Sequence, residues 1–195
     1  GTATEDQVLT AANTLADEDV LGTISYQWNR LLNGVVTAIT GETNSTYTLT
    51  QSDVGNTITV TASYTDGQNN DHSVTSDPTS VVANVNDLPT GSVTISGTAI
   101  EDQVLTASNT LADEDVLGVI TYTWSNGATG ETITLGQSDV GSTITVTASY
   151  TDGKGVDESI TSAATSKVLY SIIVNGAEAP AEDMTLTVTA PLDNL

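Results

Sequence analysis

The sequence lacks or is poor in several residue types, and each shortage excludes a class of function. Among 195 residues there is no cysteine and no phenylalanine, and Lys and Arg together number 3. Without cysteine there is neither a disulfide scaffold nor a thiolate metal site. Nucleic acids and anionic membranes are recognised through clusters of Lys and Arg. The 25 acidic residues and the formal net charge of -22 therefore argue against both as partners. No apolar run reaches membrane-spanning length, so we expect no membrane insertion.

The residues that are abundant favour β-strands. The chain contains 36 Thr, and its 37% hydrophobic content is mostly Val, Ile, Leu and Ala, with only 4% aromatic residues. Branching at Cβ stiffens the side chains of Thr, Val and Ile and suits them to a pleated surface. The composition therefore predicts a folded, highly soluble, all-β protein.

An internal repeat organises the chain. Residues 1–28 return at 97–124 with 23 identities in 28 positions, and residues 51–67 return at 137–153 with 16 identities in 17. A unit of about 85–96 residues is large enough to bury a core of its own. We predict one repeat at 1–87 and a second at 88–170, with 171–195 as the start of another module or a free strand.

Strand signals recur every 8–12 residues within each repeat, which is typical of a β-sandwich. In the second repeat the alternation of apolar residues with Thr and Ser predicts strands at 93–95, 103–107, 120–124, 132–135, 143–150 and 159–165. The first repeat has ten extra residues, and Asn33-Gly34 predicts a tight hairpin there. We expect Arg30–Val36 to form a surface loop that can be shortened at little cost in stability.

Two further features resemble the immunoglobulin-like sandwich. Trp28 and Trp124 fall on the third predicted strand of their repeats, where we expect core positions. Asp53-Val54-Gly55 and Asp139-Val140-Gly141 each precede the long strand. The predicted fold is therefore all-β, with two tandem immunoglobulin-like β-sandwich domains in a rod-like array. The second repeat opens with residues 88–96, which hold its predicted first strand. The first repeat begins without such a segment, so we expect a chain cut from a longer array.

Carboxylates gather at corresponding places in both repeats. Each repeat has Glu-Asp near its start and Asp-Glu-Asp soon afterwards: Glu5-Asp6 and Asp17-Glu18-Asp19, then Glu101-Asp102 and Asp113-Glu114-Asp115. The join between the repeats carries Asn84, Asn86 and Asp87 before Pro89. Oxygen ligands in loops at the end of a domain suit Ca²⁺, which takes six to eight oxygens in flexible geometry. The alternative interpretation is a solvated acidic surface that keeps the protein soluble.

Several segments together resemble the extender repeats of very large secreted bacterial adhesins of the RTX type. They are EDQVLTA, NTLADED and QSDVG with TITVTASYTDG in each repeat, and ANVNDLPTG at the join. The resemblance covers residues 1–170. It implies tandem sandwiches similar to bacterial immunoglobulin-like and cadherin-like domains, an extracellular or cell-surface location, and a role in cell adhesion and biofilm formation.

The resemblance also implies that Ca²⁺ rigidifies the joins between neighbouring repeats. Cadherin joins use Asx-Asn-Asp before Pro, which Asn84, Asn86, Asp87 and Pro89 match. The implied acidic partners near the base of the next repeat are Glu101, Asp102, Asp113 and Asp115. At the end of the second repeat the pattern is lost, because Tyr170-Ser171-Ile172-Ile173 stands in place of residues 84–87.

Three other functions were weighed against the extender role. Catalysis is not expected, because His72, the one histidine, has Glu158 as its counterpart in the second repeat. A carbohydrate-binding module would need exposed Trp or Tyr side chains as sugar platforms. A filament subunit could assemble by strand donation, with the alternating Met184–Thr189 as the donated strand and the open sheet edge of the first repeat as the acceptor.

Overall fold

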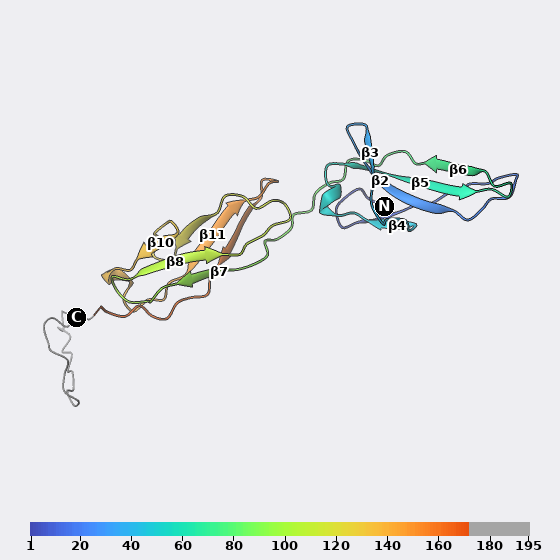
Figure 1. Cartoon of the computed structure of the whole chain (residues 1–195). Coiled ribbons are helices and arrows are strands. Elements are labelled where there is room, and N and C mark those ends of the chain that lie inside the picture. Colours follow the sequence, from blue (N-terminus) through green and yellow to red (C-terminus); the bar gives the residue numbers. More distant parts are fainter. Residues whose placement is uncertain (172–195) are drawn as a thin grey trace, which may run out of the picture. The chain divides into compact units, whose positions relative to one another are not determined.

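The computed structural model describes residues 1–171 and is all-β in this range, as the composition predicted (Figure 1). The first repeat holds β1 (Val8–Thr10), β2 (Ser25–Leu32), β3 (Val35–Ala38), β4 (Thr46–Thr48), the 3-10 turn η1 (Gln51–Asp53), β5 (Thr57–Thr65) and β6 (Asp71–Thr75). The second holds β7 (Val93–Ser96), β8 (Val104–Asn109), β9 (Thr121–Trp124), β10 (Thr132–Thr134), η2 (Gln137–Asp139), β11 (Val146–Thr151) and β12 (Asp157–Thr161). Of the segment predicted as another module or free strand, all but Ser171 lies outside the described residues.

The strands form four sheets, with orders β1-β4, β3-β2-β5-β6, β10-β8-β7 and β12-β11-β9. The repeated sequence produces repeated pairing. Leu9 lies opposite Tyr47 in the antiparallel pair of β1 and β4, and Leu105 lies opposite Ile133 in the antiparallel pair of β8 and β10. None of the helical turns in residues 1–171 has the length or apolar character that a membrane crossing requires.

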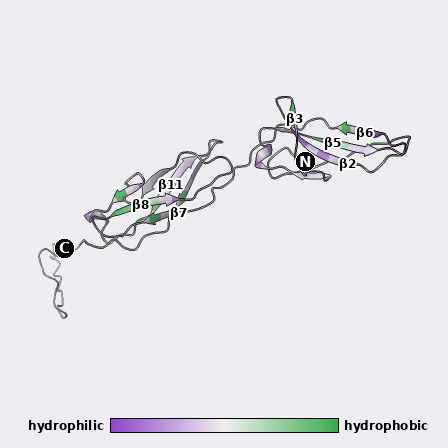
Figure 2. Ribbon diagram, viewed as in Figure 1, coloured by the Kyte–Doolittle hydropathy of each residue, from purple (hydrophilic) through white to green (hydrophobic). Residues whose placement is uncertain are grey.

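Alternation along the strands places the core. In β11, Val146, Ala148 and Tyr150 are buried and the residues between them are partly exposed. Figure 2 shows the same mixture of hydrophobic and hydrophilic residues within single strands such as β8. Both tryptophans are buried, as predicted, with 3% of Trp28 and 2% of Trp124 exposed. Each indole N–H donates to a backbone carbonyl, that of Asn44 at 2.9 Å and that of Gly130 at 2.8 Å.

The predicted Asn-Gly hairpin is confirmed. Asn33 and Gly34 have φ angles of 49° and 82°, the left-handed values that a two-residue turn between β2 and β3 requires. Leu32, Val35 and Val36 on its two arms are exposed. The hairpin lengthens β2, so β5 pairs with it as far as Thr57.

The second repeat has a short connection after β9 instead of this hairpin, and its long strand begins later than predicted. β11 begins at Val146 rather than at residue 143. Before it, the N–H groups of Ile144 and Thr145 donate to the hydroxyls of Thr165 and Ser125 instead of to a strand ladder.

The described chain divides into two compact units whose limits differ from those of the sequence repeats. The first unit comprises Gly1–Ser92, Thr110–Ile120 and Ser149–Ile160, and the second comprises Val93–Asn109, Thr121–Ala148 and the chain from Thr161 onward. The repeat boundaries at 87 and 170 therefore stay predictions. All the residues of the candidate site below belong to the first unit.

Candidate metal site

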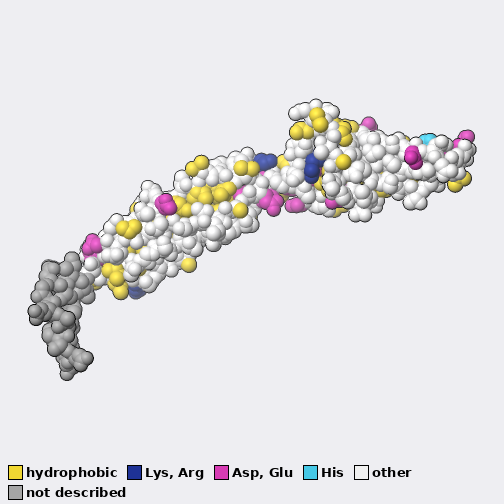
Figure 3. Space-filling model, viewed as in Figure 1, with side chains coloured by type: hydrophobic (Ala, Val, Ile, Leu, Met, Phe, Trp, Pro, Cys, Tyr) yellow, Lys and Arg dark blue, Asp and Glu magenta, His cyan; other side chains and the backbone are white. Residues whose placement is uncertain are grey.

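Eight polar residues of the first compact unit lie together and are named here the acidic cluster: Glu5, Gln51, Asn84, Asp87, Asp113, Glu114, Asp115 and Asp152. Carboxylate oxygens of Glu5, Asp87 and Glu114 lie within 4.8 Å of one another, and so do those of Asp113, Asp115 and Asp152. Figure 3 shows a group of Asp and Glu side chains gathered on one part of the surface, with few Lys and Arg in the view.

Asp115 is the most buried member, with 0% of its surface exposed. One carboxylate oxygen accepts hydrogen bonds from Nδ2 of Asn84 and from the backbone N–H of Asp87, each at 3.1 Å. The other accepts a hydrogen bond from Nε2 of Gln51 at 2.8 Å. Asp115 therefore ties the segment that carries Asn84 and Asp87 to η1 through one buried anion.

Asp113 shapes the loop that carries Asp115. Its Oδ1 accepts the backbone N–H of Asp115 at 2.8 Å, the local turn that an Asp side chain favours. Its Oδ2 accepts the hydroxyl of Tyr150 from β11. Both oxygens of Asp113 are thus oriented by neighbours in the same unit.

Asp152 is placed by the Asp-Gly turn that follows β11. Its Oδ1 accepts the backbone N–H groups of Lys154 and Val156, both at 2.8 Å, and only 7% of the residue is exposed. Gly153 next to it donates its N–H to the carbonyl of Asp115 at 2.8 Å. A side chain at Gly153 would overlap that carbonyl oxygen, so glycine lets the two loops approach.

Burial and like charges perturb the carboxyl groups. Burial raises the pKa of Glu5 against the lowering effect of the hydrogen bond from Val85, and the charges of Asp87 and Asp6 raise it further. Burial also raises the pKa of Asp87, helped by the charge of Asp115.

Asp115 behaves differently from these two. Its own burial would raise its pKa, but the hydrogen bonds from Asp87, Asn84 and Gln51 together lower it. The cluster thus holds one stabilised anion beside carboxylates that repel one another.

Three buried side-chain oxygens of the cluster have no hydrogen-bond partner. Among the described residues, four buried side-chain N or O atoms lack a partner, namely Oε1 of Gln51, Oδ1 of Asn84, Oδ2 of Asp152 and Oγ1 of Thr59. Leaving a buried polar atom unpaired costs about 1–3 kcal/mol. Only the Thr59 hydroxyl, in β5, lies outside the cluster. The donor set therefore fits a hard cation, which binds carboxylate and amide oxygens.

Of the seven predicted ligands, four lie in the acidic cluster and three lie outside it. Those in the cluster are Asn84, Asp87, Asp113 and Asp115. Asn86 is exposed and donates from Nδ2 to Oε1 of Glu158 at 2.9 Å.

The other two predicted ligands belong to the second compact unit. Glu101 accepts the N–H of Ser171 at 3.4 Å. The N–H of Asp102 donates to the carbonyl of Leu135 at 2.9 Å. Neither residue is part of an acidic group of three in residues 1–171.

The sequence did not single out Gln51 and Asp152 as members of the site, and it marked Glu5 and Glu114 only as part of the Glu-Asp and Asp-Glu-Asp runs. A signal existed for Glu5, because its counterpart Glu101 was named and the two occupy the same position in the repeat. Asp152 stands in an Asp-Gly pair, which is typical of a turn and carries no signal of a ligand. For Gln51 the sequence offers no signal, since its amide reaches Asp115 across 64 residues of chain.

A second group combines carboxylates with the histidine. Asp17, Asp66 and His72 of the first repeat have ligand atoms within 4.8 Å of one another. Nε2 of His72 lies 3.2 Å from Oδ2 of Asp66, and the imidazole stacks on Tyr64 with ring centroids 5.1 Å apart. All three are counterparts of acidic residues in the second repeat, because Asp17, Asp66 and His72 align with Asp113, Asp152 and Glu158.

Comparison with known proteins places the chain in no family. No protein-family model matches it, and no curated protein matches it. The burial of both tryptophans also removes the two best sugar platforms from the surface, while Tyr170 has 63% of its surface exposed.

Proposed function

We propose that the chain is a structural extender of a repetitive bacterial cell-surface or secreted protein, rigidified by Ca²⁺ at the acidic cluster. In this proposal each sequence repeat is an immunoglobulin-like sandwich. Asn84–Asp87 is the connecting segment that the ion stiffens, and the partners are neighbouring repeats of the same chain or neighbouring subunits. The role is mechanical and needs no catalytic residue.

The unpartnered oxygens of Gln51, Asn84 and Asp152 carry the calcium proposal. Each belongs to a residue whose other polar atom is already fixed by a hydrogen bond, so each oxygen is held in place. Ca²⁺ accepts amide and carboxylate oxygens together and tolerates irregular geometry. An ion would satisfy these oxygens without rearranging the hydrogen bonds around Asp115.

Electrostatics supports the same conclusion. The raised pKa values of Glu5 and Asp87, which originate in burial and neighbouring carboxylates, mean that their ionised forms are disfavoured. A divalent cation is the largest local charge in such a site and reverses this preference. Binding would therefore hold the cluster together where the carboxylates alone repel one another.

Asp152→Asn tests the proposal while sparing the fold. The Asn side chain keeps an oxygen for the N–H groups of Lys154 and Val156 but places an amide NH₂ at the position of the unpartnered oxygen. Asp66→Asn is the matched control, because Asp66 makes the same turn with Gln68 and Asn70. Its second oxygen, however, is already hydrogen-bonded to Asn70.

The readout is a Ca²⁺ titration followed by the side-chain amide NMR signals of Gln51 and Asn84, together with thermal unfolding. We expect a dissociation constant on the order of 0.1–1 mM. At 100 times that concentration the native state gains about 2.7 kcal/mol. Asp152→Asn should weaken the response at both amides and Asp66→Asn should not. If neither Ca²⁺ nor chelator moves these signals or the melting temperature, the acidic cluster is a solvated surface and the proposal fails.

A further inference from the structure

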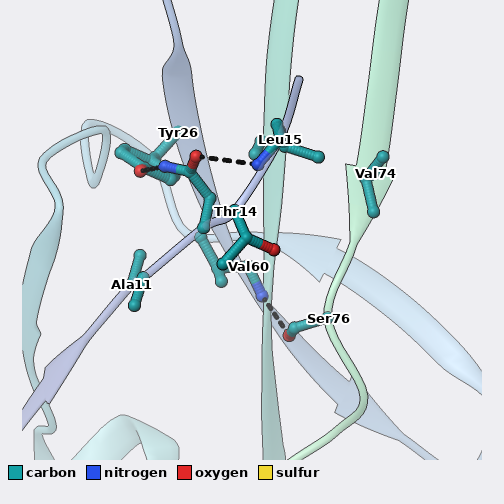
Figure 4. Close-up of a pocket in the computed structure, with 10 residues that line it drawn as sticks. Ala11, Thr14, Leu15, Tyr26, Val60, Val74 and Ser76 are labelled. Carbon is teal, nitrogen blue, oxygen red and sulfur yellow. Dashed lines mark hydrogen bonds between the residues drawn. The ribbon is translucent and has the colours of Figure 1, made fainter. Parts of the chain in front are cut away.

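The first repeat has an open groove beside β1, with a volume of about 320 Å³. One wall is the chain from Ala11 to Leu15, and the other is formed by Tyr26 of β2, Val60 and Ala62 of β5, and the region of Val74 and Ser76. Figure 4 shows this wall of Ala11, Thr14 and Leu15 facing Val60, Val74 and Ser76. Every lining residue is uncharged, in a chain of formal net charge -22.

The same positions are closed in the second repeat. Val60 is half-buried, whereas its counterpart Val146 is 0% exposed. Leu15 is half-buried and its counterpart Leu111 is buried. Ser76 and Ser162 differ likewise, since the first is exposed and the second is buried. Residues in nearly identical sequence are thus buried in the second repeat and more exposed in the first.

The second repeat has a strand at this edge, β7, for which the first repeat has no counterpart within residues 1–171. β7 pairs antiparallel with β8, with Val93 opposite Asn109 and Ile95 opposite Ala107, and Val93 is itself buried. In the first repeat the counterpart of β8 is β1 with the residues up to Asn13. Within residues 1–171, β1 pairs only with β4, so its other edge has no strand partner.

The glycine that precedes β1 lies against the backbone in the same way as the glycine that precedes β8. Gly97 follows β7 directly and lies so close to the carbonyl of Val104 that a side chain would overlap it. Gly1 lies in the same way against the carbonyl of Val8. The part of the β7–β8 turn that leads into β8 therefore has a counterpart in the first repeat, where it leads into β1.

We propose that this groove binds an extended strand of the Ser-Val-Thr-Ile-Ser type, added antiparallel along the outer edge of β1 and the residues that follow it up to Asn13, with its two apolar residues opposite Asn13 and Ala11. Main-chain hydrogen bonds would supply affinity, and the alternation of Val and Ile with hydroxyl residues would supply specificity. The occupant is defined by the second repeat itself, where Ser92–Ser96 fills the corresponding place. This inference is independent of calcium and goes beyond the proposed function.

The backbone contacts predict which N–H groups receive the strand. In the second repeat the N–H of Thr110 donates to the carbonyl of Ser92 at 3.0 Å, and the N–H of Ala112 donates to that of Thr90 at 3.1 Å. The corresponding donors in the first repeat are Thr14 and Ala16. Thr14→Pro removes one of them, and Thr14→Ala is its control.

The first experiment supplies the strand in cis. The sequence of residues 89–96, Pro-Thr-Gly-Ser-Val-Thr-Ile-Ser, is joined to the amino end of the full chain, with a control in which Asp replaces its Val and Ile. We expect amide hydrogen exchange at Ala11–Leu15 to slow about tenfold or more with the first extension and to stay unchanged with the Asp version. Equal exchange in both extended proteins and in the parent chain would overturn the proposal.

The second experiment supplies the strand in trans. A peptide of residues 88–96 is titrated into the full chain while the backbone NMR signals of residues 11–15 and 60–62 are followed. The expected result is a saturable shift that Thr14→Ala retains and Thr14→Pro loses, with unchanged near-ultraviolet circular dichroism of Trp28 in both variants. Shifts that survive Thr14→Pro would overturn strand addition. So would dimers of the parent chain that the peptide does not dissociate, because a second copy would then occupy the groove.

Discussion

Nε of Arg30 lies 2.6 Å from Oδ1 of Asp53, whose side chain is completely buried. The same carboxylate accepts the hydroxyl of Tyr47 at 2.6 Å and the backbone N–H of Thr50 at 2.8 Å. Arg30 stands at the base of the Asn-Gly hairpin, so this one residue of the predicted surface loop belongs to a buried polar network. Shortening Arg30–Val36 as a whole would remove this charged partner of Asp53, and the expectation that such shortening costs little stability stays a prediction.

Replacing Arg30 should destabilise the first repeat. Arg30→Ala leaves the buried Asp53 with neutral donors only, and we expect the free energy of unfolding to fall by about 2 kcal/mol. Leu32→Ala, on the exposed arm of the same hairpin, should change it by less than about 0.5 kcal/mol. Urea unfolding followed by Trp fluorescence measures both. Equal losses in the two variants would contradict a role for the ion pair.

A shorter hairpin that keeps Arg30 should leave the stability of the protein nearly unchanged. Replacing residues 32–35 with the three-residue Ser-Asn-Gly connection of the second repeat shortens the chain by one residue and removes only exposed residues. Since loop length enters the closure entropy only logarithmically, we expect a change below about 1 kcal/mol. Thermal unfolding of the shortened chain checks this, and failure to fold would place the arms of the hairpin in the core.

Glu5→Gln should have opposite effects with and without Ca²⁺. Because the pKa of Glu5 is raised in the folded protein, mainly by burial, the folded state binds this proton more tightly than the unfolded state. Stability therefore falls as the pH rises through that pKa, so the ionised form of Glu5 opposes folding. In chelator we expect the melting temperature of Glu5→Gln to equal or exceed that of the parent, and in Ca²⁺ to lie below it.

Glu101→Gln is the control for this reversal. Glu101 also accepts a backbone N–H, from Ser171, but it belongs to none of the acidic groups found in residues 1–171. Its melting temperature should shift equally in chelator and in Ca²⁺. A Glu5→Gln variant that loses stability equally under both conditions would show that Glu5 serves the fold and not the ion.

Tyr47 should make the protein sensitive to alkali. Burial, together with the hydrogen bond to Asp53, raises the pKa of Tyr47 to about 12. A raised folded-state pKa means that this contribution to stability is complete below the unfolded value of about 10 and is lost as the pH rises toward the folded value. Tyr47→Phe should remove that part of the decline in stability. Urea midpoints measured between pH 9 and pH 11.5 test the difference in slope.

The sequence predicted the all-β class and most strand positions because alternation and turn residues act locally. All six strands predicted for the second repeat overlap observed ones, and Asn33-Gly34 turns where expected. The late start of β11 was not predictable from its alternation. It depends on the neighbouring strand: the long β2 pairs with residues 57–59 of the first repeat, whereas β9 ends at Trp124 and does not extend along residues 143–145.

The composition of the acidic cluster was only partly predictable for a similar reason. Asp113 and Asp115 are conspicuous in the sequence as a run of acids. The amides of Gln51 and Asn84 carry no such mark, and both converge on Asp115 through long-range contacts. Which side-chain oxygens remain without a hydrogen-bond donor depends on where the fold places the donors. The sequence alone does not show this.

The acidic cluster takes Gln51 and Asn84 from the first repeat and Asp113 and Asp152 from the second, and the first repeat also has Asp17 and Asp66 at the positions of Asp113 and Asp152. Under the proposed extender role, a tandem copy of the first repeat would therefore bring the same four residue types to its new junction. The replacement of Asn84 by Tyr170 breaks this rule at the end of the second repeat. If the proposed extender role holds, an array could gain such junctions by copying the first repeat, but not by copying a repeat that ends with Tyr in place of Asn84.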